Sequence, residues 1–478
     1  MNELADLSAV DQLRGFQGRT LSPVDVARAV IDRVAKFNPR YNAFCHVDEA
    51  QTLAAAAESE RRWRSATPRG ALDGVIVSVK DNLTTQDMPT RYGTLTAQKR
   101  PADEDAASVA QLRAAGAIIL GKTATSEMGN KIVTDSPLTG ITRNPWNPEL
   151  TPGGSSGGAA VAVALGMGAI AVGSDGGGSI RIPSCWTGVF GFKPTYDRVP
   201  AYPAGWYGTM HHVGPLTRTV EDAALALNVM CGTDPRAWSQ LPSDRRDYRA
   251  GLERGVKGLR IAYSSDLGLT DVTVDKEIAA TVKRSVEQFS KLGAHVEESN
   301  PPRIADVLKC LGIHWIVSTL CGVEQIPAHE RSLLEPRIRD LAEAARKISS
   351  LDYMRAMYHR IELGGEINEW FSRFDLLVLP TFHVGAPQGG TFPDSILGPP
   401  RFTGPFNVTR YPAASIPCGL SAAGLPIGLQ VVGRHNQDAL VLRACRAFEA
   451  IRGVFPKPPG LRIGTSSGTS AGYGHHAG

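Results

Sequence analysis

The sequence of 478 residues lacks the features that define several common classes of protein. Its seven cysteines are scattered and include no C-x-x-C pair, so we expect reduced thiols rather than a disulfide framework or a zinc site. The charges nearly balance, with 51 Lys and Arg against 47 Asp and Glu, and no basic cluster is interleaved with aromatic residues. This composition gives no support to nucleic-acid binding.

Long hydrophobic runs are also missing. The apolar runs fall short of about 18 residues and are broken by glycine, so we expect no membrane span. The N-terminal segment MNELADLSAVDQLRGF is acidic and has no apolar core, which is not typical of a secretory signal. We therefore expect a cytoplasmic protein.

Short apolar runs alternate with helical patterns along much of the chain. Strands are predicted at 74–80 and 117–120, and a helix capped by Asp105 is predicted between them. Ser22-Pro23 predicts the start of another helix, which Asn38-Pro39 is expected to end. This strand–helix–strand spacing predicts an α/β fold with parallel strand pairs.

One stretch, residues 151–195, is unusually rich in glycine and serine. Glycine is useful where the backbone must approach a ligand or where several amide N–H groups turn inward together. Serine beside such amides suggests a nucleophile beside an oxyanion hole. Within this stretch, GGSSGG precedes a predicted helix and SDGGGS follows a predicted strand, and ligands of α/β sheets bind at such ends.

Lys80 ends a predicted strand. Amide hydrolysis without a metal needs a serine nucleophile, a proton acceptor and donors for the oxyanion, and Ser–Lys pairs are one known arrangement. A lysine is a base only when it is neutral, and burial lowers its pKa in that direction. A second serine hydroxyl between the lysine and the nucleophile can relay the proton. Taken alone, a lysine at a strand end is usually a solvated surface charge, and glycine-serine runs are more often linkers or phosphate cradles. The sequence has neither G-x-x-x-x-G-K-[ST] nor the order G-x-G-x-x-G in this stretch, which argues against nucleotide binding.

The motifs GGSSGG, GSDGGGSIRIP and GFKPT resemble the amidase signature family. The spacing agrees too, with Lys80 and Ser155 separated by 75 positions and Ser155 and Ser179 by 24. Weaker resemblance, in RNPWNP, GPLTRTVEDAA and GLPIGLQVVGR, extends over most of the chain around a core motif at 74–224. The resemblance implies a large mixed, mostly parallel central sheet with helices on both faces. It also implies an amidase that cleaves a linear carboxylic amide C–N bond and needs no metal or organic cofactor.

The same resemblance implies the roles of the motif residues. Ser179 is expected to be the acylated nucleophile, Ser155 the bridging serine after a cis peptide bond, and Lys80 the general base. The oxyanion hole is expected from the backbone amides of Gly176, Gly177, Gly178 and Ser179. The residues expected to brace this loop are Ser156, Asp175 and Arg181.

Family position and composition also suggest a substrate pocket. Its candidate residues are Met128, Gly129, Asn130, Trp206, Tyr207 and the loop 382–405. An apolar and aromatic lining suits a small neutral amide with an aryl or alkyl group. The sequence leaves open the acyl group, the amine, and whether the substrate is an amide, a hydrazide, a urea-like compound or an ester.

Other interpretations remain open. In glutamine-dependent tRNA amidotransferases, the subunit that frees ammonia from glutamine for its partner usually continues past KPT with a YGRVSRYG-like run. This chain has YDRVPAYP at 196–203, which favours a stand-alone amidase. The sequence leaves the oligomeric state open, and the resemblance makes a homodimer one of the possible states. A non-catalytic scaffold of the same fold is the third interpretation, and the presence of Lys80, Ser155 and Ser179 argues against it.

Two further expectations concern a cysteine and the ends of the domain. Cys185 with His211 or His212 suggests a cysteine hydrolase, although a buried structural thiol is favoured. Residues 1–463 are expected to form one large domain, followed by a flexible tail at 464–478.

Overall fold

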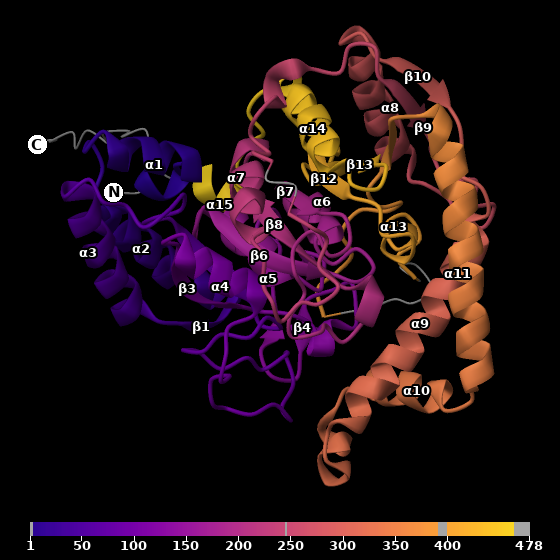
Figure 1. The fold of residues 1–478 in the computed structure, drawn as a ribbon, viewed down its shortest axis with the longest axis horizontal. Helices are drawn as coiled ribbons and strands as arrows, with labels where there is room; N and C mark the ends of the chain where they lie inside the picture. Colours follow the sequence, from indigo (N-terminus) through magenta and orange to yellow (C-terminus); the bar gives the residue numbers. More distant parts are fainter. Residues whose placement is uncertain (1–2, 244–245, 391–398, 463–478) are drawn as a thin grey trace, which may run out of the picture.

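The computed structural model describes residues 3–243, 246–390 and 399–462. Its centre is one sheet of 11 strands in the order β1-β3-β2-β6-β8-β7-β12-β13-β11-β9-β10 (Figure 1). The strands of this sheet are β1 (Phe44–Val47), β2 (Ile76–Lys80), β3 (Ile118–Thr123), β6 (Ile170–Asp175), β7 (Phe190–Lys193), β8 (His212–Thr217), β9 (Arg260–Tyr263), β10 (His295–Glu298), β11 (Leu376–Pro380), β12 (Ala413–Leu420) and β13 (Pro426–Gly433). A separate two-stranded sheet contains β4 (Asp135–Ser136) and β5 (Gly140–Ile141).

The large sheet is mixed, as predicted, but the prediction that it is mostly parallel is wrong. The parallel pairs are β2–β3, β2–β6, β9–β10 and β9–β11, whereas the other neighbouring pairs are antiparallel. Parallel pairing arises where a helix crosses over between strands, as between β2 and β3. By contrast, β12 and β13 are joined by a short turn, and β7 and β8 by a segment without an α-helix, so both pairs run antiparallel.

Helices surround the sheet. The α-helices are α1 (Ala9–Gln17), α2 (Pro23–Tyr41), α3 (Glu49–Arg64), α4 (Ala107–Ala114), α5 (Gly157–Ala164), α6 (Arg181–Thr187), α7 (Val220–Met230), α8 (Lys276–Lys291), α9 (Ile304–Glu324), α10 (Pro336–Ala345), α11 (Ser350–Trp370), α13 (Pro405–Val408), α14 (Asp438–Arg452) and α15 (Pro459–Arg462). The 3₁₀ helices are η1 (Leu4–Asp6), η2 (Glu127–Gly129), η3 (Gly208–Met210), η4 (Leu252–Arg254), η5 (Ala328–Leu333) and η6 (Phe371–Arg373).

Two predictions about helix ends are wrong. Helix α2 continues past Asn38-Pro39 to Tyr41 and ends at Asn42, whose φ of 51° is left-handed. Asp105 does not cap α4, because its carboxylate instead accepts the Gln86 amide and pairs with Arg113. The start of α2 is as predicted, with the Ser22 hydroxyl accepting the Val24 amide.

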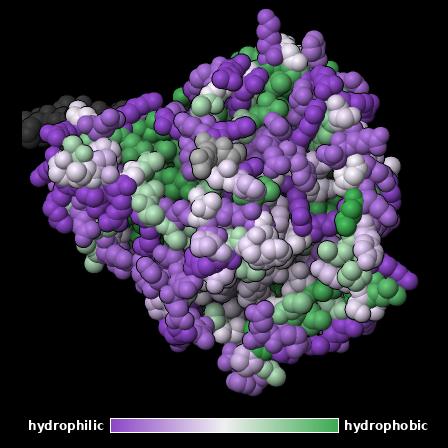
Figure 2. Space-filling view, in the orientation of Figure 1, coloured by the Kyte–Doolittle hydropathy of each residue, from purple (hydrophilic) through white to green (hydrophobic). Residues whose placement is uncertain are grey.

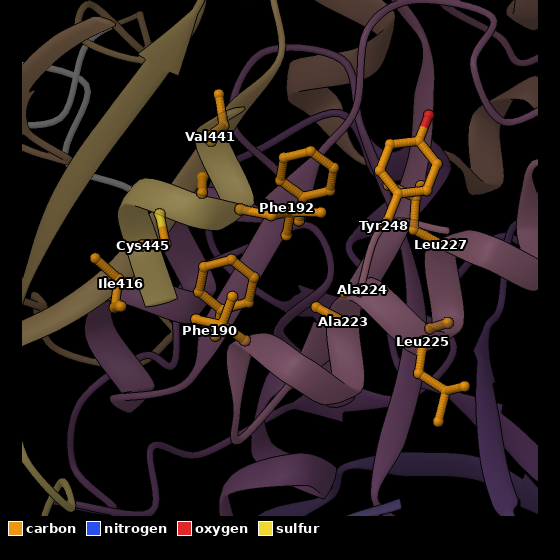
Figure 3. Packing of buried hydrophobic residues seen from close by; sticks show 14 of the residues in the cluster. Phe190, Phe192, Ala223, Ala224, Leu225, Leu227, Tyr248, Ile416, Val441 and Cys445 are labelled. Carbon is orange, nitrogen blue, oxygen red and sulfur yellow. The ribbon is translucent and has the colours of Figure 1, made fainter. Parts of the chain in front are cut away.

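Helices cover both faces of the sheet, as predicted. On one face, Phe190 and Phe192 of β7 pack against α7 and α14, whose side chains surround them in Figure 3. On the other face, Ala171 of β6 packs against α5, while its neighbours Ile170 and Val172 belong to the α7 side. This division follows from the strand geometry, because successive residues point to opposite faces.

Helices α9, α10 and α11 form an arm along the right side of Figure 1. By length and composition, α9 is apolar enough to cross a membrane, although the sequence predicts no such segment. One helix of this kind is weak evidence, because core helices of other proteins pass the same test. In this fold, α9 packs against α10, α11 and α13. The expected tail at 464–478 and the last residue of the expected domain lie outside the described residues.

Candidate active site

The carboxyl end of β2 meets the segment that leads into α5. Lys80, the last residue of β2, donates from Nζ to the Ser155 hydroxyl over 2.7 Å. Lys80 is fully buried and Ser155 is 2% exposed. The peptide bond between Gly154 and Ser155 is cis, as the resemblance implied. The two polar groups separated by 75 positions in sequence are therefore in direct contact.

The environment of Lys80 favours its neutral form. Burial lowers the pKa of Lys80 to about 7, and the charge of Asp175 opposes this shift. The other groups that accept from Nζ are the Ser174 hydroxyl at 3.0 Å and the Ser174 carbonyl at 3.4 Å. Within residues 3–243, 246–390 and 399–462, no carboxylate accepts a hydrogen bond from Nζ or pairs with it. A large share of Lys80 is consequently uncharged near neutral pH.

Ser174 and Asn82 also belong to this network, and sequence reasoning assigned neither a role. The Asn82 side chain donates from Nδ2 to the Ser174 hydroxyl over 2.8 Å, and this hydroxyl also accepts from Lys80. Both residues lie next to recognised positions, since Ser174 is in the SDGGGS run and Asn82 follows Lys80 by two positions. Their closeness in sequence to Lys80 and to the glycine-serine motif was therefore the signal that could have identified Ser174 and Asn82.

Residues 176–179, which we call the glycine loop, connect β6 to α6. Asp175 at the start of the loop accepts the backbone amide of Ile180 at 3.1 Å and the Arg181 guanidinium at 2.9 and 3.0 Å. Both side chains of the Asp175–Arg181 ion pair are fully buried. Burial alone would raise the pKa of Asp175, but the Arg181 charge and hydrogen bonds hold it well below its usual range. The pair joins the two ends of the glycine loop.

The backbone amides of the glycine loop make no hydrogen bond to the part of the chain that the structure describes. Among the residues that the structure describes, no group accepts a hydrogen bond from the amides of Gly176, Gly177, Gly178 and Ser179. Gly178 has a φ of 143°, which only glycine adopts readily. Successive backbone amides that have no acceptor within the protein can form an anion-binding hollow.

Ser156 links the glycine loop to the segment around Ser155. Its amide donates to the Ser179 carbonyl over 3.1 Å, and its hydroxyl donates to the Ser174 carbonyl over 3.1 Å. The side chain of Ser179 is 5% exposed. The four serines of these two motifs, Ser155, Ser156, Ser174 and Ser179, therefore lie within one hydrogen-bonded network at the junction of β2, β6, α5 and α6.

Residues far along the sequence hold the glycine loop from its other side. Thr403 donates from Oγ1 to the Gly177 carbonyl over 2.6 Å, and Asn407 donates from Nδ2 to the Asp175 carbonyl over 2.8 Å. Arg181 donates to the side-chain oxygen of Gln430 over 2.8 Å. Sequence reasoning assigned Thr403, Asn407 and Gln430 no role in holding the loop, although Thr403 lies in the predicted pocket loop 382–405 and Gln430 in the GLPIGLQVVGR run. All three lie more than 220 positions from the glycine loop, so no local pattern links them to it.

The predicted pocket residues gather beside this network. Met128, Trp206 and Tyr207 line a small cavity together with Asn82 and His211. Trp206 stacks on Tyr92 with ring centroids 5.3 Å apart. The cavity therefore has aromatic walls.

Gly129 and Asn130 lie next to the cavity residues. A methyl group on Gly129 would lie 3.3 Å from the Ser155 hydroxyl. Asn130 donates to the Tyr207 hydroxyl at 3.2 Å and to the Thr319 hydroxyl at 2.9 Å. In the expected loop 382–405, Pro400 and Thr403 approach the glycine loop, whereas residues 391–398 lie outside the described part.

Cys185, His211 and His212, which the sequence suggested as a cysteine hydrolase site, lie in different environments. Burial raises the pKa of Cys185 to about 12, and its side chain packs in an apolar cluster with Trp186 and Phe382. The thiol is thus protonated at neutral pH, which fits the structural interpretation. His211 lines the cavity, where burial and then the Lys80 charge lower its pKa to about 4. The His212 ring lies 2.8 Å from the Met210 carbonyl through Nδ1.

The side chains that commonly bind metal ions are dispersed over the described ranges. No group of three or more His, Cys, Asp and Glu side chains is arranged there to hold a metal ion. No disulfide joins the cysteines in the same ranges.

Comparison with known proteins assigns the chain to a family of enzymes. The sequence model of the Amidase family matches residues 25–442, so the chain belongs to this family. The chain is accordingly an enzyme that hydrolyses amide C–N bonds, and the resemblance noted in the sequence is confirmed.

Individual relatives extend along nearly the whole chain. An acylamidase of Rhodococcus erythropolis is 34% identical over 465 residues, which cover 95% of this chain and 97% of the relative. One subunit of the glutamyl-tRNA(Gln) amidotransferase of Alkaliphilus metalliredigens (strain QYMF) is 30% identical, with 96% and 99% covered. The crystal structure of a bacterial aryl acylamidase of the amidase signature family superposes with a TM-score of 0.86 at 30% identity, with 93% and 96% covered.

Proposed function

We propose that this enzyme hydrolyses a small neutral amide through a covalent acyl intermediate on Ser179, with Ser155 and Lys80 as its proton relay. The observation that carries the proposal is the 2.7 Å contact between Lys80 Nζ and the Ser155 hydroxyl. A lysine with a pKa of about 7 has the neutral fraction that a general base requires. Ser–Lys pairs perform the same chemistry in other hydrolases.

The steps follow from these three side chains. Lys80 takes the proton of Ser155, Ser155 takes the proton of Ser179, and the Ser179 oxygen bonds to the amide carbon. The C–N bond then breaks as the relay returns a proton to the leaving nitrogen. The nitrogen departs as a neutral amine, and the acyl group stays bound to Ser179 as an ester. Water, deprotonated through the same relay, attacks the ester, and the proton returns to Ser179 as the carboxylic acid departs.

The glycine loop is proposed to stabilise the oxyanion of each tetrahedral intermediate. Its unpaired amides are backbone donors fixed before the reaction, which cost no reorganisation when negative charge develops on the carbonyl oxygen. The bonds from Asp175, Arg181 and Thr403 support this role, because they hold the loop at both ends and in the middle.

The proposed substrate carries an aryl or alkyl group. The cavity walls contain Trp206 and Tyr207, and Trp315 of α9 stacks on Tyr207 with centroids 4.0 Å apart. Flat aromatic walls favour a planar apolar group. The similarity to an acylamidase and to an aryl acylamidase supports the same class of substrate.

We propose further that the enzyme works alone rather than within an amidotransferase. The run YDRVPAYP at 196–203 departs from the pattern of the amidotransferase subunits. We also expect a cytoplasmic enzyme that needs no metal and no organic cofactor, because the relay and the glycine loop supply the base, the nucleophile and the oxyanion donors.

The test is amine release by the purified chain alone across a panel of aryl and alkyl amides, with glutamine included. We expect hydrolysis of neutral amides, loss of activity in Ser179→Ala, and labelling of wild type but not Ser179→Ala by a serine-reactive fluorophosphonate. Glutamine hydrolysis that requires added partner subunits would favour the amidotransferase. A wild type that is neither active nor labelled would favour the scaffold.

Lys122 provides a matched control for the lysine. It is also fully buried, lies on the neighbouring parallel strand β3 opposite Val79, and has a pKa that burial lowers to about 8. Its Nζ donates to the Leu83 carbonyl and the Thr90 hydroxyl rather than to the serines. We expect Lys80→Met to lose at least about 100-fold in kcat. Lys122→Met should keep the kcat of the wild type, measured per folded molecule. Equal losses in the two variants would contradict the assignment of Lys80.

A further inference from the structure

Helix α11 is apolar on two opposite faces. Its inner face is buried and includes Ala356, Leu363 and Ile367. The residues of its outer face, which we call the outer stripe, are Leu351, Met354, Tyr358 and Ile361, exposed by 57%, 42%, 61% and 69%. Figure 2 shows apolar surface along the right side of the molecule, where Figure 1 places α11. A surface helix usually has one apolar face, so the second requires an explanation.

The outer stripe has the spacing of a helix–helix seam. Its members follow one another at intervals of three, four and three residues, as do the a and d positions of a heptad. The next a position is Gly365. A methyl group built on Gly364 or Gly365 would meet no atom of the described residues within 4 Å. Glycine inside an exposed helix costs about 1 kcal/mol relative to alanine, and its small size allows a second helix to approach closely.

Charges of opposite sign border the outer stripe. Arg355 and Glu362 both occupy e positions of this heptad, seven residues apart, and their side chains are 69% and 67% exposed. In an antiparallel helix pair, e positions lie opposite e positions of the other helix. A two-fold axis near residues 359 and 360 would place a second copy of α11 antiparallel to the first. Arg355 of each chain would then lie near Glu362 of the other chain, which gives two equivalent ion pairs. The same register sets Tyr358 against Ile361 and Met354 against Gly365.

We propose that the outer stripe of α11 is a dimer interface, at which α11 packs antiparallel against α11 of a second copy of this chain. The pairing is self-complementary in shape and in charge, as a two-fold interface must be. It gives a homodimer, one of the states that the sequence leaves open, a defined surface, and it does not depend on the substrate or mechanism proposed above.

A membrane surface is the other occupant that an apolar helix face suggests. Helices that lie in a membrane interface are rich in Lys and Arg on their polar face. The border of the outer stripe has a different composition, because one of its e positions is the basic Arg355 and the next is the acidic Glu362. Charges of both signs favour a protein partner over a membrane surface. One helix pair covers less than the roughly 800 Å² per partner of a standard interface, so we expect a dimer that dissociates at micromolar concentration.

Sedimentation velocity of the full chain from about 1 to 100 µM tests the proposal, because a dimer with a small interface is expected to dissociate in this range of concentration. We expect a monomer–dimer equilibrium that Ile361→Glu shifts to monomer. Arg355→Glu and Glu362→Arg, each alone, oppose like charges across the interface and should weaken the dimer about tenfold or more. The double variant Arg355→Glu/Glu362→Arg restores opposite charges and should restore the dimer, a result that only this register predicts.

Controls separate this surface from general effects. Val454 is 97% exposed and lies outside α11, so Val454→Glu should leave the equilibrium unchanged. Thermal denaturation should show that the charge variants remain folded, since both side chains are exposed. A wild type that stays monomeric at the highest concentration, a double variant as weak as the single ones, or a monomer whose binding to phosphatidylcholine vesicles is lost in Ile361→Glu would overturn the proposal.

Discussion

The Tyr207 ring lies face to face with Trp315 beside the glycine loop, with ring planes only 13° apart. A methyl group on Gly176 would lie 3.2 Å from Tyr207 and 3.5 Å from Trp315. The Tyr207 hydroxyl donates to the Met128 carbonyl over 3.2 Å, which fixes the ring at its outer end. Through this stack, the helical arm contributes a wall directly beside the proposed oxyanion hole.

Removing this wall should change substrate preference more than catalysis. We expect Trp315→Ala to lower kcat/KM for aryl amides about tenfold relative to a small alkyl amide, the scale of one aromatic contact. The measurement is kcat/KM for an anilide and for an aliphatic amide with the same acyl group. Trp315→Phe retains a flat ring and should preserve most of the preference. An equal loss for both substrates would mean that Trp315 does not contact the substrate.

The rate should depend on the ionisation of Lys80. Burial lowers its pKa to about 7, and the proposed relay starts only from the neutral amine. Below this pH the lysine carries a proton and accepts none, so kcat/KM should fall about tenfold per pH unit and level off above pH 7 to 8.

His211 does not account for such a profile. Burial and the Lys80 charge lower its pKa to about 4, so it stays neutral across the same window. A profile of kcat/KM from pH 5 to 9 checks the prediction, with His211→Gln as the comparison that should leave the inflection near 7. An inflection that moves with His211→Gln would assign the proton to the histidine.

The sequence predicted that Lys80 and the two glycine-serine motifs lie together, because the family resemblance and the predicted ends of strands and helices both place them at one edge of the sheet. Lys80 ends a strand, Ser155 precedes a helix, and the glycine loop follows a strand, so the edge of an α/β sheet brings them together. The predicted contact between Lys80 and Ser155 is present at 2.7 Å.

The rest depends on tertiary packing that the sequence does not encode locally. Thr403 reaches the Gly177 carbonyl and Trp315 reaches Tyr207 only after the chain has folded back on itself. The direction of the strands was missed for a similar reason. Neither β7 nor β8 is predicted as a strand from the sequence, and their antiparallel pairing depends on the helix-free path of the segment between them.

The buried pair of Asp175 and Arg181 should matter for stability. Asp175→Asn leaves the fully buried Arg181 guanidinium without its countercharge, and such changes typically cost about 3–5 kcal/mol. Urea denaturation should show this loss in the free energy of unfolding. The exposed pair of Arg100 and Asp103, with side chains 63% and 85% exposed, provides the control. Asp103→Asn should leave unfolding unchanged, and an Asp175→Asn protein as stable as Asp103→Asn would contradict the bracing role.

Gly178 allows a sharper test of the oxyanion hole than removal of a side chain. Its φ is 143°, and a methyl group there would lie 2.3 Å from Thr403 Oγ1, the atom that donates to the Gly177 carbonyl. Gly178→Ala should therefore displace the loop amides and lower kcat about 10²–10³-fold, the usual loss for one oxyanion donor, with a smaller effect on KM. Gly140, at a φ of 71°, has no described atom within 4 Å of such a methyl group. Gly140→Ala shares the backbone strain and should keep full kcat, whereas an equally active Gly178→Ala would show that the reaction does not need these amides.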